Sequence, residues 1–408
     1  MHLSAIEKSL LEGETGTAAK KAMEILVALG KIFHAQDMVE VSSAQIAGVS
    51  YQNIGDPGIE FLTHWVELDA AVRIPAFMNP AGIDRNQWKQ MGFSESFAVK
   101  QLEIISLLQK MGIAPTLSCT PYHLGHTPTI HEHVAWSESS AVSYANSVLG
   151  ARTNREGGPS ALAAAITGRT PRFGLHLQEN RRATHRIDVK CKLTHASEFG
   201  LIGYLVGKAV GNGIPYFCTL TLPEGEIDRT SALKTLGAAM AASGAVALYH
   251  VHDFTPELLE APDAVISSDL PVVAIDSIEQ AIASLRQQGT QLDLVALGCP
   301  HSSIEQIREI AEFIGDRTCK AKLWITTSAA VRTIAASSGL IDQLNHAGVN
   351  VIADTCMVVA PLQSLDIKYV GVDSAKAACY LPSHQGMTTY WGTTEQCIES
   401  AIEGQWKF

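Results

Sequence analysis

The chain has 408 residues, of which 46% are hydrophobic and 17% are charged, so it can bury a large core and is not a disordered protein. Thirty basic and 41 acidic residues give a formal net charge of −11, which argues against nucleic-acid binding because that requires a basic surface. No run of 18 apolar residues is present and the N-terminus lacks a signal-peptide pattern, so we expect a cytoplasmic protein with no membrane span.

The first half of the chain is expected to begin with helices and to continue with short strands and loops. Apolar residues recur at helical spacing near the N-terminus, and Gly, Pro and Asn clusters separate the later segments. The expected elements, in chain order, are a helical start over 5–34, an extended run over 38–41, a loop over 42–58, a strand over 72–77, a helix over 97–111, a strand over 113–118, and helices over 134–149 and 161–167.

The second half of the chain shows a more regular alternation. A buried helix is expected to run into a strand within residues 236–251. The further expected elements are strands over 245–251, 272–275, 292–297, 323–326 and 349–352, and helices over 278–287, 304–314 and 330–336. Strands that alternate with helices indicate βαβ units and a parallel sheet. We therefore expect an α/β fold, with approximate lobes over 1–190, 191–240 and 241–408.

Three cysteines share one sequence context. Cys119, Cys299 and Cys356 each follow the end of an expected strand, which is where ligands bind in open α/β sheets. Three thiolates that converge there could hold an iron–sulfur cluster or a zinc ion. Because no local C-x-x-C motif is present, buried cysteines that only fill space remain an alternative. The cysteines expected to be structural are Cys191, Cys218, Cys319, Cys379 and Cys397.

A Gly-rich segment over 153–160 is a candidate anion site. Pro159 suits the first turn of a helix, whose backbone N–H groups attract anions, and Arg155 could add a bidentate contact. The alternative is an ordinary helix start with a solvated arginine. Other motifs are weaker: no P-loop or G-x-S-x-G elbow occurs, and His131 and His133 stand two residues apart, which does not place them on one helix face.

Nine short motifs along the chain agree in residues and order with one known family. They are 43–51, 53–56, 78–82, 119–122, 136–141, 150–159, 298–301, 354–356 and 374–378. On these residues the sequence resembles the aconitase X family, and the resemblance covers nearly the whole chain. It implies an aconitase-like, multi-lobed α/β/α fold with mainly parallel sheets and an iron–sulfur site at the carboxyl ends of strands.

The resemblance also implies the chemistry, namely an iron–sulfur hydro-lyase. A [4Fe–4S] cluster would be held by Cys119, Cys299 and Cys356, and its iron without a protein thiolate would act as a Lewis acid on the substrate hydroxyl. The catalytic candidates implied are Glu138, Ser139 and Lys376. The substrate-binding candidates are Gly48, Val49, Ser50, Asn79, Pro80 and Arg155. Asp373 stands where the family usually has Asn and Cys379 where it has His, so a negative charge is expected near Lys376.

The resemblance further implies a partner. Family members carry a swivelling domain, fused or as a separate small subunit, that supplies a serine thought to act as the base. At 408 residues the chain resembles the large subunit of the split form. We therefore expect a heterodimer in cells and an inactive isolated chain, with no nucleic-acid or membrane partner.

The substrate is left open between two family activities. These are dehydration of cis-3-hydroxy-L-proline and dehydration of 5-phosphomevalonate in an archaeal isoprenoid route. A phosphate would need cations, for which Arg85, Arg152, Arg155 and Lys376 are candidates. The sequence lacks the charge-rich composition of a hyperthermophilic protein, so we slightly favour hydroxyproline. Two further alternatives are an iron–sulfur sensor and a zinc-structured protein without catalysis.

Overall fold

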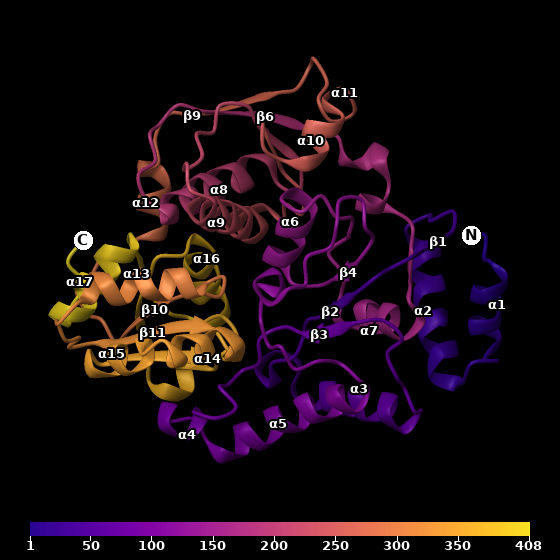
Figure 1. Cartoon of the computed structure of the whole chain (residues 1–408), viewed down its shortest axis with the longest axis horizontal. Helices are drawn as coiled ribbons and strands as arrows, with labels where there is room; N and C mark the ends of the chain where they lie inside the picture. Colours follow the sequence, from indigo (N-terminus) through magenta and orange to yellow (C-terminus); the bar gives the residue numbers. More distant parts are fainter.

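The structure is a computed structural model that describes residues 1–408, apart from the side chain of residue 227. Figure 1 shows three groups of helices and strands arranged around a common centre, with the N-terminal group at the right and bottom, the middle group at the top and the C-terminal group at the left. Three sheets, ordered β3-β2-β4, β8-β7-β6-β9 and β12-β11-β10-β13-β14, are entirely parallel, and β1 and β5 form an antiparallel pair. The expected α/β class with mainly parallel sheets is confirmed.

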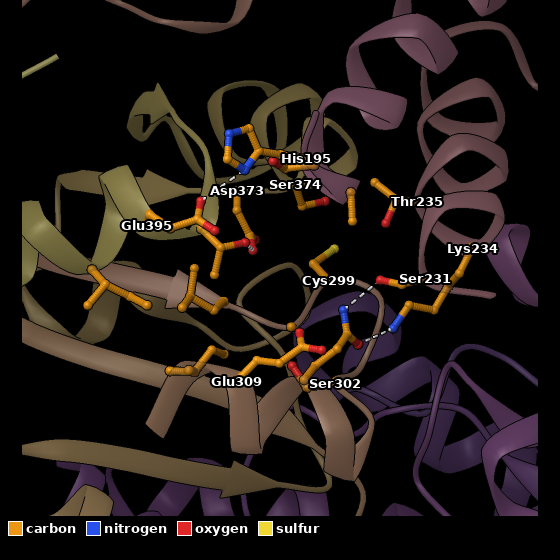
Figure 2. Close-up of a pocket in the computed structure, with 18 of the residues that line it drawn as sticks. His195, Ser231, Lys234, Thr235, Cys299, Ser302, Glu309, Asp373, Ser374 and Glu395 are labelled. Atoms are coloured by element: carbon orange, nitrogen blue, oxygen red, sulfur yellow. Dashed lines mark hydrogen bonds and ion pairs between the residues drawn. The ribbon is translucent and has the colours of Figure 1, made fainter. Parts of the chain in front are cut away.

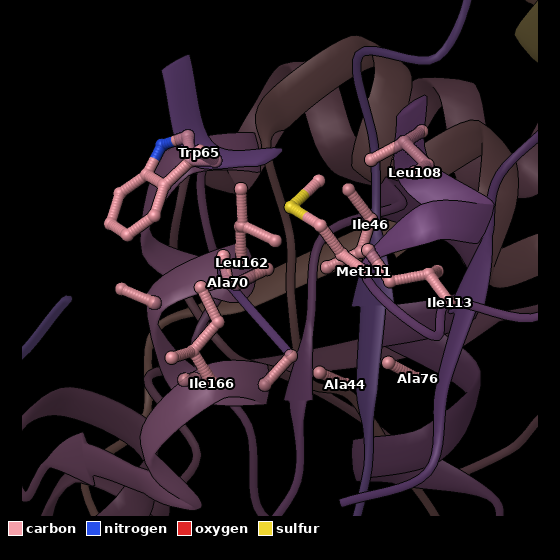
Figure 3. Close-up of a cluster of buried hydrophobic side chains, with 14 of the residues drawn as sticks. Ala44, Ile46, Trp65, Ala70, Ala76, Leu108, Met111, Ile113, Leu162 and Ile166 are labelled. Carbon is pink, nitrogen blue, oxygen red and sulfur yellow. The ribbon is translucent and has the colours of Figure 1, made fainter. Parts of the chain in front are cut away.

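The first lobe, residues 1–181, packs helices on both sides of a small sheet. All three residues of β2, including the polar Gln45, are buried, as parallel strands covered on both faces require. Figure 3 shows the core between this sheet, Trp65 and the apolar faces of two helices. The elements are α1 (Ala5–Glu12), α2 (Thr17–Ile32), β1 (Met38–Glu40), β2 (Ala44–Ile46), α3 (Tyr51–Glu67), β3 (Ala76–Met78), α4 (Trp88–Met91), α5 (Glu95–Lys110), η1 (Pro121–Leu124), β4 (Ala135–Trp136), α6 (Ser139–Ser147), α7 (Gly158–Thr167), β5 (Arg169–Pro171), η2 (Gly174–His176) and η3 (Gln178–Arg181).

The second lobe is built on the four-stranded sheet and two long helices. Helices α8 and α9 can approach closely at Gly203 because this residue has no Cβ; a Cβ there would collide with the backbone oxygen of Leu236. The boundary expected near residue 240 falls inside α9, and the sheet continues to β9. The elements are β6 (His185–Val189), α8 (Ala196–Val210), β7 (Pro215–Phe217), α9 (Glu226–Gly244), β8 (His250–Val251), α10 (Pro256–Glu260), α11 (Pro262–Val265) and β9 (Val272–Ile275).

The third lobe contains the five-stranded sheet, whose central strand β10 is buried at every residue. No helix in the described part of the chain combines the length and the apolar character needed to cross a membrane. The elements are α12 (Glu279–Leu285), β10 (Leu294–Leu297), α13 (Ile304–Ile314), β11 (Lys322–Thr327), α14 (Ala329–Ser337), α15 (Leu340–His346), β12 (Val349–Ala353), η4 (Leu362–Leu365), β13 (Tyr369–Val372), α16 (Ala375–Gln385), β14 (Thr388–Trp391) and α17 (Thr394–Glu403).

Three local expectations from the sequence were wrong. The loop expected over 42–58 contains β2 and the start of α3, in which Gly55, at a non-helical φ of 56°, separates a first short turn from the rest of the helix. The helix expected over 134–149 begins as strand β4, which pairs with β2. The strand expected over 113–118 forms only one bridge, because Pro115 has no N–H and Leu117 adopts a positive φ of 47°.

One buried arginine ties the first two lobes together. Arg181 is fully buried, and its Nε donates to the Glu257 carboxylate at 2.6 Å. Its other two nitrogens donate to the side chain and carbonyl of Asn146 and to the carbonyls of Ala151 and Leu175, at 2.9–3.2 Å. All five N–H groups of the guanidinium can therefore be satisfied, by partners from both lobes.

Below pH 6.5 the chain is expected to lose stability because buried histidines stay neutral in the fold. Burial lowers the pKa of His176 to about 3 and that of His250 to about 4, from an ordinary value of 6.5. As the pH falls below 6.5 the unfolded chain takes up these protons and the folded chain does not, so unfolding becomes more favourable. Each histidine contributes about 1.4 kcal/mol per pH unit until its folded-state pKa is reached.

Urea unfolding between pH 7 and pH 5 measures this effect. His250→Gln is expected to make stability less dependent on pH over this range, whereas His252→Gln, at an exposed neighbouring position, should leave the dependence unchanged. Equal pH dependence in all three proteins would contradict the assignment.

Candidate active site

A cavity of about 100 Å³ lies where segments from the first and third lobes meet. It gathers eight of the candidate residues named from the sequence, although they are spread from position 79 to position 376. The residues that line it are Asn79, Pro80, Cys119, Glu138, Ser139, Cys299, Cys356, Val358, Val359, Lys376 and Tyr380. The other three, Val358, Val359 and Tyr380, were not among the candidates, because their residue types carry no signal of a site.

Parallel strands explain how the thiols reach one place. Cys299 follows β10 and Cys356 follows β12, which both end at the carboxyl edge of the five-stranded sheet. Cys119 arrives differently, from an irregular segment that runs beside β3 and is anchored where the Ser118 N–H donates to the Met78 carbonyl at 3.2 Å. Two of the three cysteines thus occupy the expected strand-end position.

The three thiols form a donor set that fits an iron–sulfur cluster. All three are buried and free of disulfides, and burial raises the pKa of each, that of Cys299 to about 12, so a bound metal group would have to displace their protons. Among the described residues no three His, Cys, Asp or Glu side chains are arranged to hold a single metal ion. The thiols line a cavity instead, and the Oδ1 atom of Asn79, which also lines it, is buried without a hydrogen-bond partner. This arrangement suits a group larger than one ion.

A buried ion pair forms one wall of the cavity. Lys376 donates from Nζ to Glu138 Oε1, and Glu138 Oε2 also accepts from Ser140 Oγ and the Ala141 N–H, both at 2.6 Å. Burial alone would raise the pKa of Glu138, but the Lys376 ammonium and these hydrogen bonds outweigh it and lower that pKa. Burial would lower the pKa of Lys376, but the Glu138 carboxylate and the neighbouring thiols raise it. Both groups are therefore charged.

His301 is a functional candidate that the sequence analysis did not name. It is fully buried, and burial lowers its pKa to about 4, so the ring is neutral. Because the Thr355 carbonyl can only accept, Nε2 carries the proton and donates to it at 3.0 Å. Nδ1 then accepts from Ser118 Oγ at 3.3 Å. The sequence feature that could have identified His301 is its position two residues after Cys299.

The loop over residues 48–50 supports the cavity from outside. Ser50 Oγ donates to the Val359 carbonyl at 2.8 Å, so this loop braces the segment that follows Cys356, but none of Gly48, Val49 and Ser50 lines the cavity. Arg155 is exposed and does not line it either. The reason is its position before α7, where the side chain faces solvent.

The two other arginines proposed as phosphate partners already have partners of their own. Arg85 donates from Nε to Asp354 Oδ2 at 2.7 Å, next to the cysteine loop at 356. Arg152 bonds to Gln178 and to His131. Lys376 is the only cation that lines the cavity in the described chain.

A second cavity, of about 280 Å³, lies on the other side of Cys299 (Figure 2). Lys234, Asp373 and Glu395 line it. Thr394 donates to Asp373 at 2.9 Å, and burial raises the pKa of this carboxyl to about 6. The expectation that Asp373 places its charge beside Lys376 was wrong, because Asp373 faces this second cavity; the carboxylate that pairs with Lys376 is that of Glu138.

The fold and the first cavity together define an α/β enzyme whose site is assembled from two lobes. Three family profiles match the chain: Aconitase X first domain over residues 1–179, Aconitase X second domain over 183–283 and Aconitase X third domain over 292–403. The chain belongs to the aconitase X family. It is a dehydratase, and hence a hydro-lyase, as its relatives are named.

Individual relatives agree over nearly the full length. A phosphomevalonate dehydratase large subunit of Methanothermobacter thermautotrophicus is 50% identical, over 95% of each chain. The crystal structure of Thermococcus kodakaraensis aconitase X in its holo-form is 44% identical, with a TM-score of 0.90 over 98% of this chain and 100% of that one. A cis-3-hydroxy-L-proline dehydratase of Pseudomonas aeruginosa is 32% identical over 99% of this chain and 70% of its own.

Proposed function

We propose that the chain is the large subunit of a phosphomevalonate dehydratase, with an iron–sulfur cluster on Cys119, Cys299 and Cys356. The observation that carries this proposal is one cavity in which three buried thiols face a charged lysine–glutamate pair. Four relatives at 42–50% identity bear that name, whereas two named cis-3-hydroxy-L-proline dehydratases are 30–32% identical. These identities favour phosphomevalonate over the hydroxyproline that the sequence slightly favoured, although a fifth phosphomevalonate dehydratase large subunit is only 32% identical.

Dehydration breaks a C–O bond and a neighbouring C–H bond and forms a C=C bond and water. The cluster, when bound, supplies a Lewis-acidic iron for the departing hydroxyl. Lys376 contributes the single positive charge of the cavity and holds Glu138 ionised. Glu138 is a poor proton acceptor because Lys376, Ser140 and the Ala141 N–H all donate to it and lower its pKa. Ser139 also donates to Glu138, at 3.3 Å.

The base is therefore assigned to a second subunit. Near pH 7 no side chain that lines the cavity is suited to accept the proton, because the three thiols have raised pKa values and keep their own protons. The cavity, at about 100 Å³, is also well below the roughly 300 Å³ of pockets that enclose a whole ligand. Both points support a small subunit that closes the site and brings the base, for which the family resemblance implies a serine.

The test compares the isolated chain with the chain co-purified anaerobically with the small subunit of its source. We expect a brown protein that contains iron and sulfide, and dehydration of 5-phosphomevalonate only by the complex. Preferential turnover of cis-3-hydroxy-L-proline would overturn the substrate assignment. A colourless complex that contains zinc, or no metal, would overturn the cluster.

Replacing a thiol of the cavity is expected to abolish activity. Cys356→Ser removes one of the three proposed cluster ligands. It should lower the iron content of the protein, and it should lower the rate of dehydration by at least a hundredfold. Cys397→Ser is the control, because Cys397 is also buried but lies outside the cavity, in a hydrophobic cluster where its thiol bonds to the Gly392 carbonyl. Equal iron content in the two variants would show that Cys356 is not a ligand.

A further inference from the structure

The four polar atoms of His301 bond to three different parts of the structure. The backbone N–H donates to the Cys119 sulfur at 3.2 Å, and the carbonyl accepts from Lys234 Nζ at 3.1 Å. The ring bonds through Nδ1 to Ser118 Oγ at 3.3 Å and through Nε2 to the Thr355 carbonyl at 3.0 Å. The residue is fully buried, so water does not compete for these bonds.

These bonds connect all three cysteine-bearing loops. Ser118 precedes Cys119, Thr355 precedes Cys356, and His301 itself follows Cys299 by two residues. The loops are otherwise far apart in sequence and come from two lobes. Besides lining one cavity, the three loops are therefore joined at one imidazole ring. The loop after Cys299 carries the ring, and each of the other two loops bonds to one of its nitrogens.

A lysine from the second lobe anchors the same residue from behind. Lys234, on α9, is buried and donates both to the His301 carbonyl and to Gln306 Oε1 at 2.7 Å, and Gln306 in turn donates to Ser231 at 3.0 Å. Figure 2 shows Lys234 and Ser231 on the wall of the second cavity, close to the loop that carries Cys299. His301 is thus held by a network that spans all three lobes.

We propose that His301 is a positioning residue that holds the three thiols in one arrangement before and after the cluster binds. The inference rests on the proposed function, because it assumes a cluster on these cysteines. The side chain fixes the distances between the loops, and the backbone N–H stabilises negative charge on the Cys119 sulfur. Partners that orient metal ligands in this way change metal affinity by about 10–100-fold when they are removed.

The first test needs no metal. Hydrogen exchange of the full chain without cluster is compared between the original protein, His301→Ala and His250→Ala. His250 is the matched control, since it is also buried and bonds through Nε2 to a backbone carbonyl, that of Arg181 at 2.9 Å. We expect His301→Ala to speed exchange at least tenfold in the loops around 119, 300 and 356 together. Faster exchange confined to the loop around 300 would overturn the proposal.

The second test uses the loaded complex. His301→Ala should lose iron to a chelator about tenfold faster than the original protein, with a broadened electron paramagnetic resonance signal of the reduced cluster, and His250→Ala should not. His301→Gln can still donate to the Thr355 carbonyl, so it should recover part of the retention. Equal iron loss from His301→Ala and the original protein would overturn the proposal. An original protein that binds no iron would instead refute the proposed function, and the exchange result would then decide on the loops alone.

Discussion

Replacing Lys376 with methionine is expected to abolish dehydration and to lower the free energy of unfolding by about 3–5 kcal/mol. The variant leaves the Glu138 carboxylate buried, with two hydroxyls and one N–H as its remaining partners. A buried charge without its counter-ion costs far more than the pair contributes when intact. Urea unfolding measures the stability, and the anaerobic assay of the complex measures turnover.

A double replacement separates the two consequences. Glu138→Gln with Lys376→Met removes both charges, so the stability should return to within about 1 kcal/mol of the original, because replacing a whole buried pair is often neutral. Activity should stay absent, since the cavity then has no cation. Lys100→Met provides the control at an exposed pair with Asp56, where solvent screens the charges and little change in stability is expected. A double variant as unstable as Lys376→Met alone would show that the charges are not coupled.

Replacing Arg181 with methionine is expected to destabilise the chain by at least about 3–5 kcal/mol. The change leaves the Glu257 carboxylate buried without its counter-ion. It also removes the hydrogen-bond donors to three backbone carbonyls, and each buried carbonyl left without a partner lowers the stability of the fold further. Because these partners come from the first two lobes, a separate early transition for one lobe is also expected on heating.

The adjacent Arg182 offers the control for this prediction. It is exposed, and its single described contact is a weak bond of 3.5 Å to the Asp263 carbonyl, so Arg182→Met should change the free energy of unfolding by less than about 0.5 kcal/mol. Urea unfolding followed by circular dichroism compares the two variants. Similar midpoints would mean that the buried arginine does not join the lobes.

The third lobe was the part of the fold most accessible from sequence. Up to residue 353 its strands are short apolar runs bounded by polar turns; α13 (Ile304–Ile314) has the expected bounds, and β12 (Val349–Ala353) ends one residue later than expected. The first lobe was harder, because its strands have two or three residues and are defined by their neighbours. In this lobe the polar residue Gln45 lies inside the sheet, so the pattern of hydrophobic residues does not reveal the strand that contains it.

The residues of the site could also be predicted only in part, because some are marked by local pattern and others are brought together only by the fold. Strand ends marked Cys299 and Cys356 from local pattern, and the family resemblance added Glu138 and Lys376. The pairing of these last two could not be read from the sequence, since they are 238 positions apart. The contacts of His301 depend in the same way on three loops that meet only in the folded chain.

The spacing of the thiols has a consequence for how the enzyme matures. Cys119 leaves the ribosome 356 − 119 = 237 residues before Cys356. At about 5–20 residues per second, synthesis of that stretch takes on the order of 10–50 s. Throughout this time the set of thiols is incomplete, because Cys299 is made 180 residues after Cys119 and Cys356 is made last. For the cluster proposed above, metal loading is therefore a late event in biogenesis, after translation has passed residue 356, and a ribosome-stalled or truncated chain that ends earlier would emerge with an incomplete set of thiols.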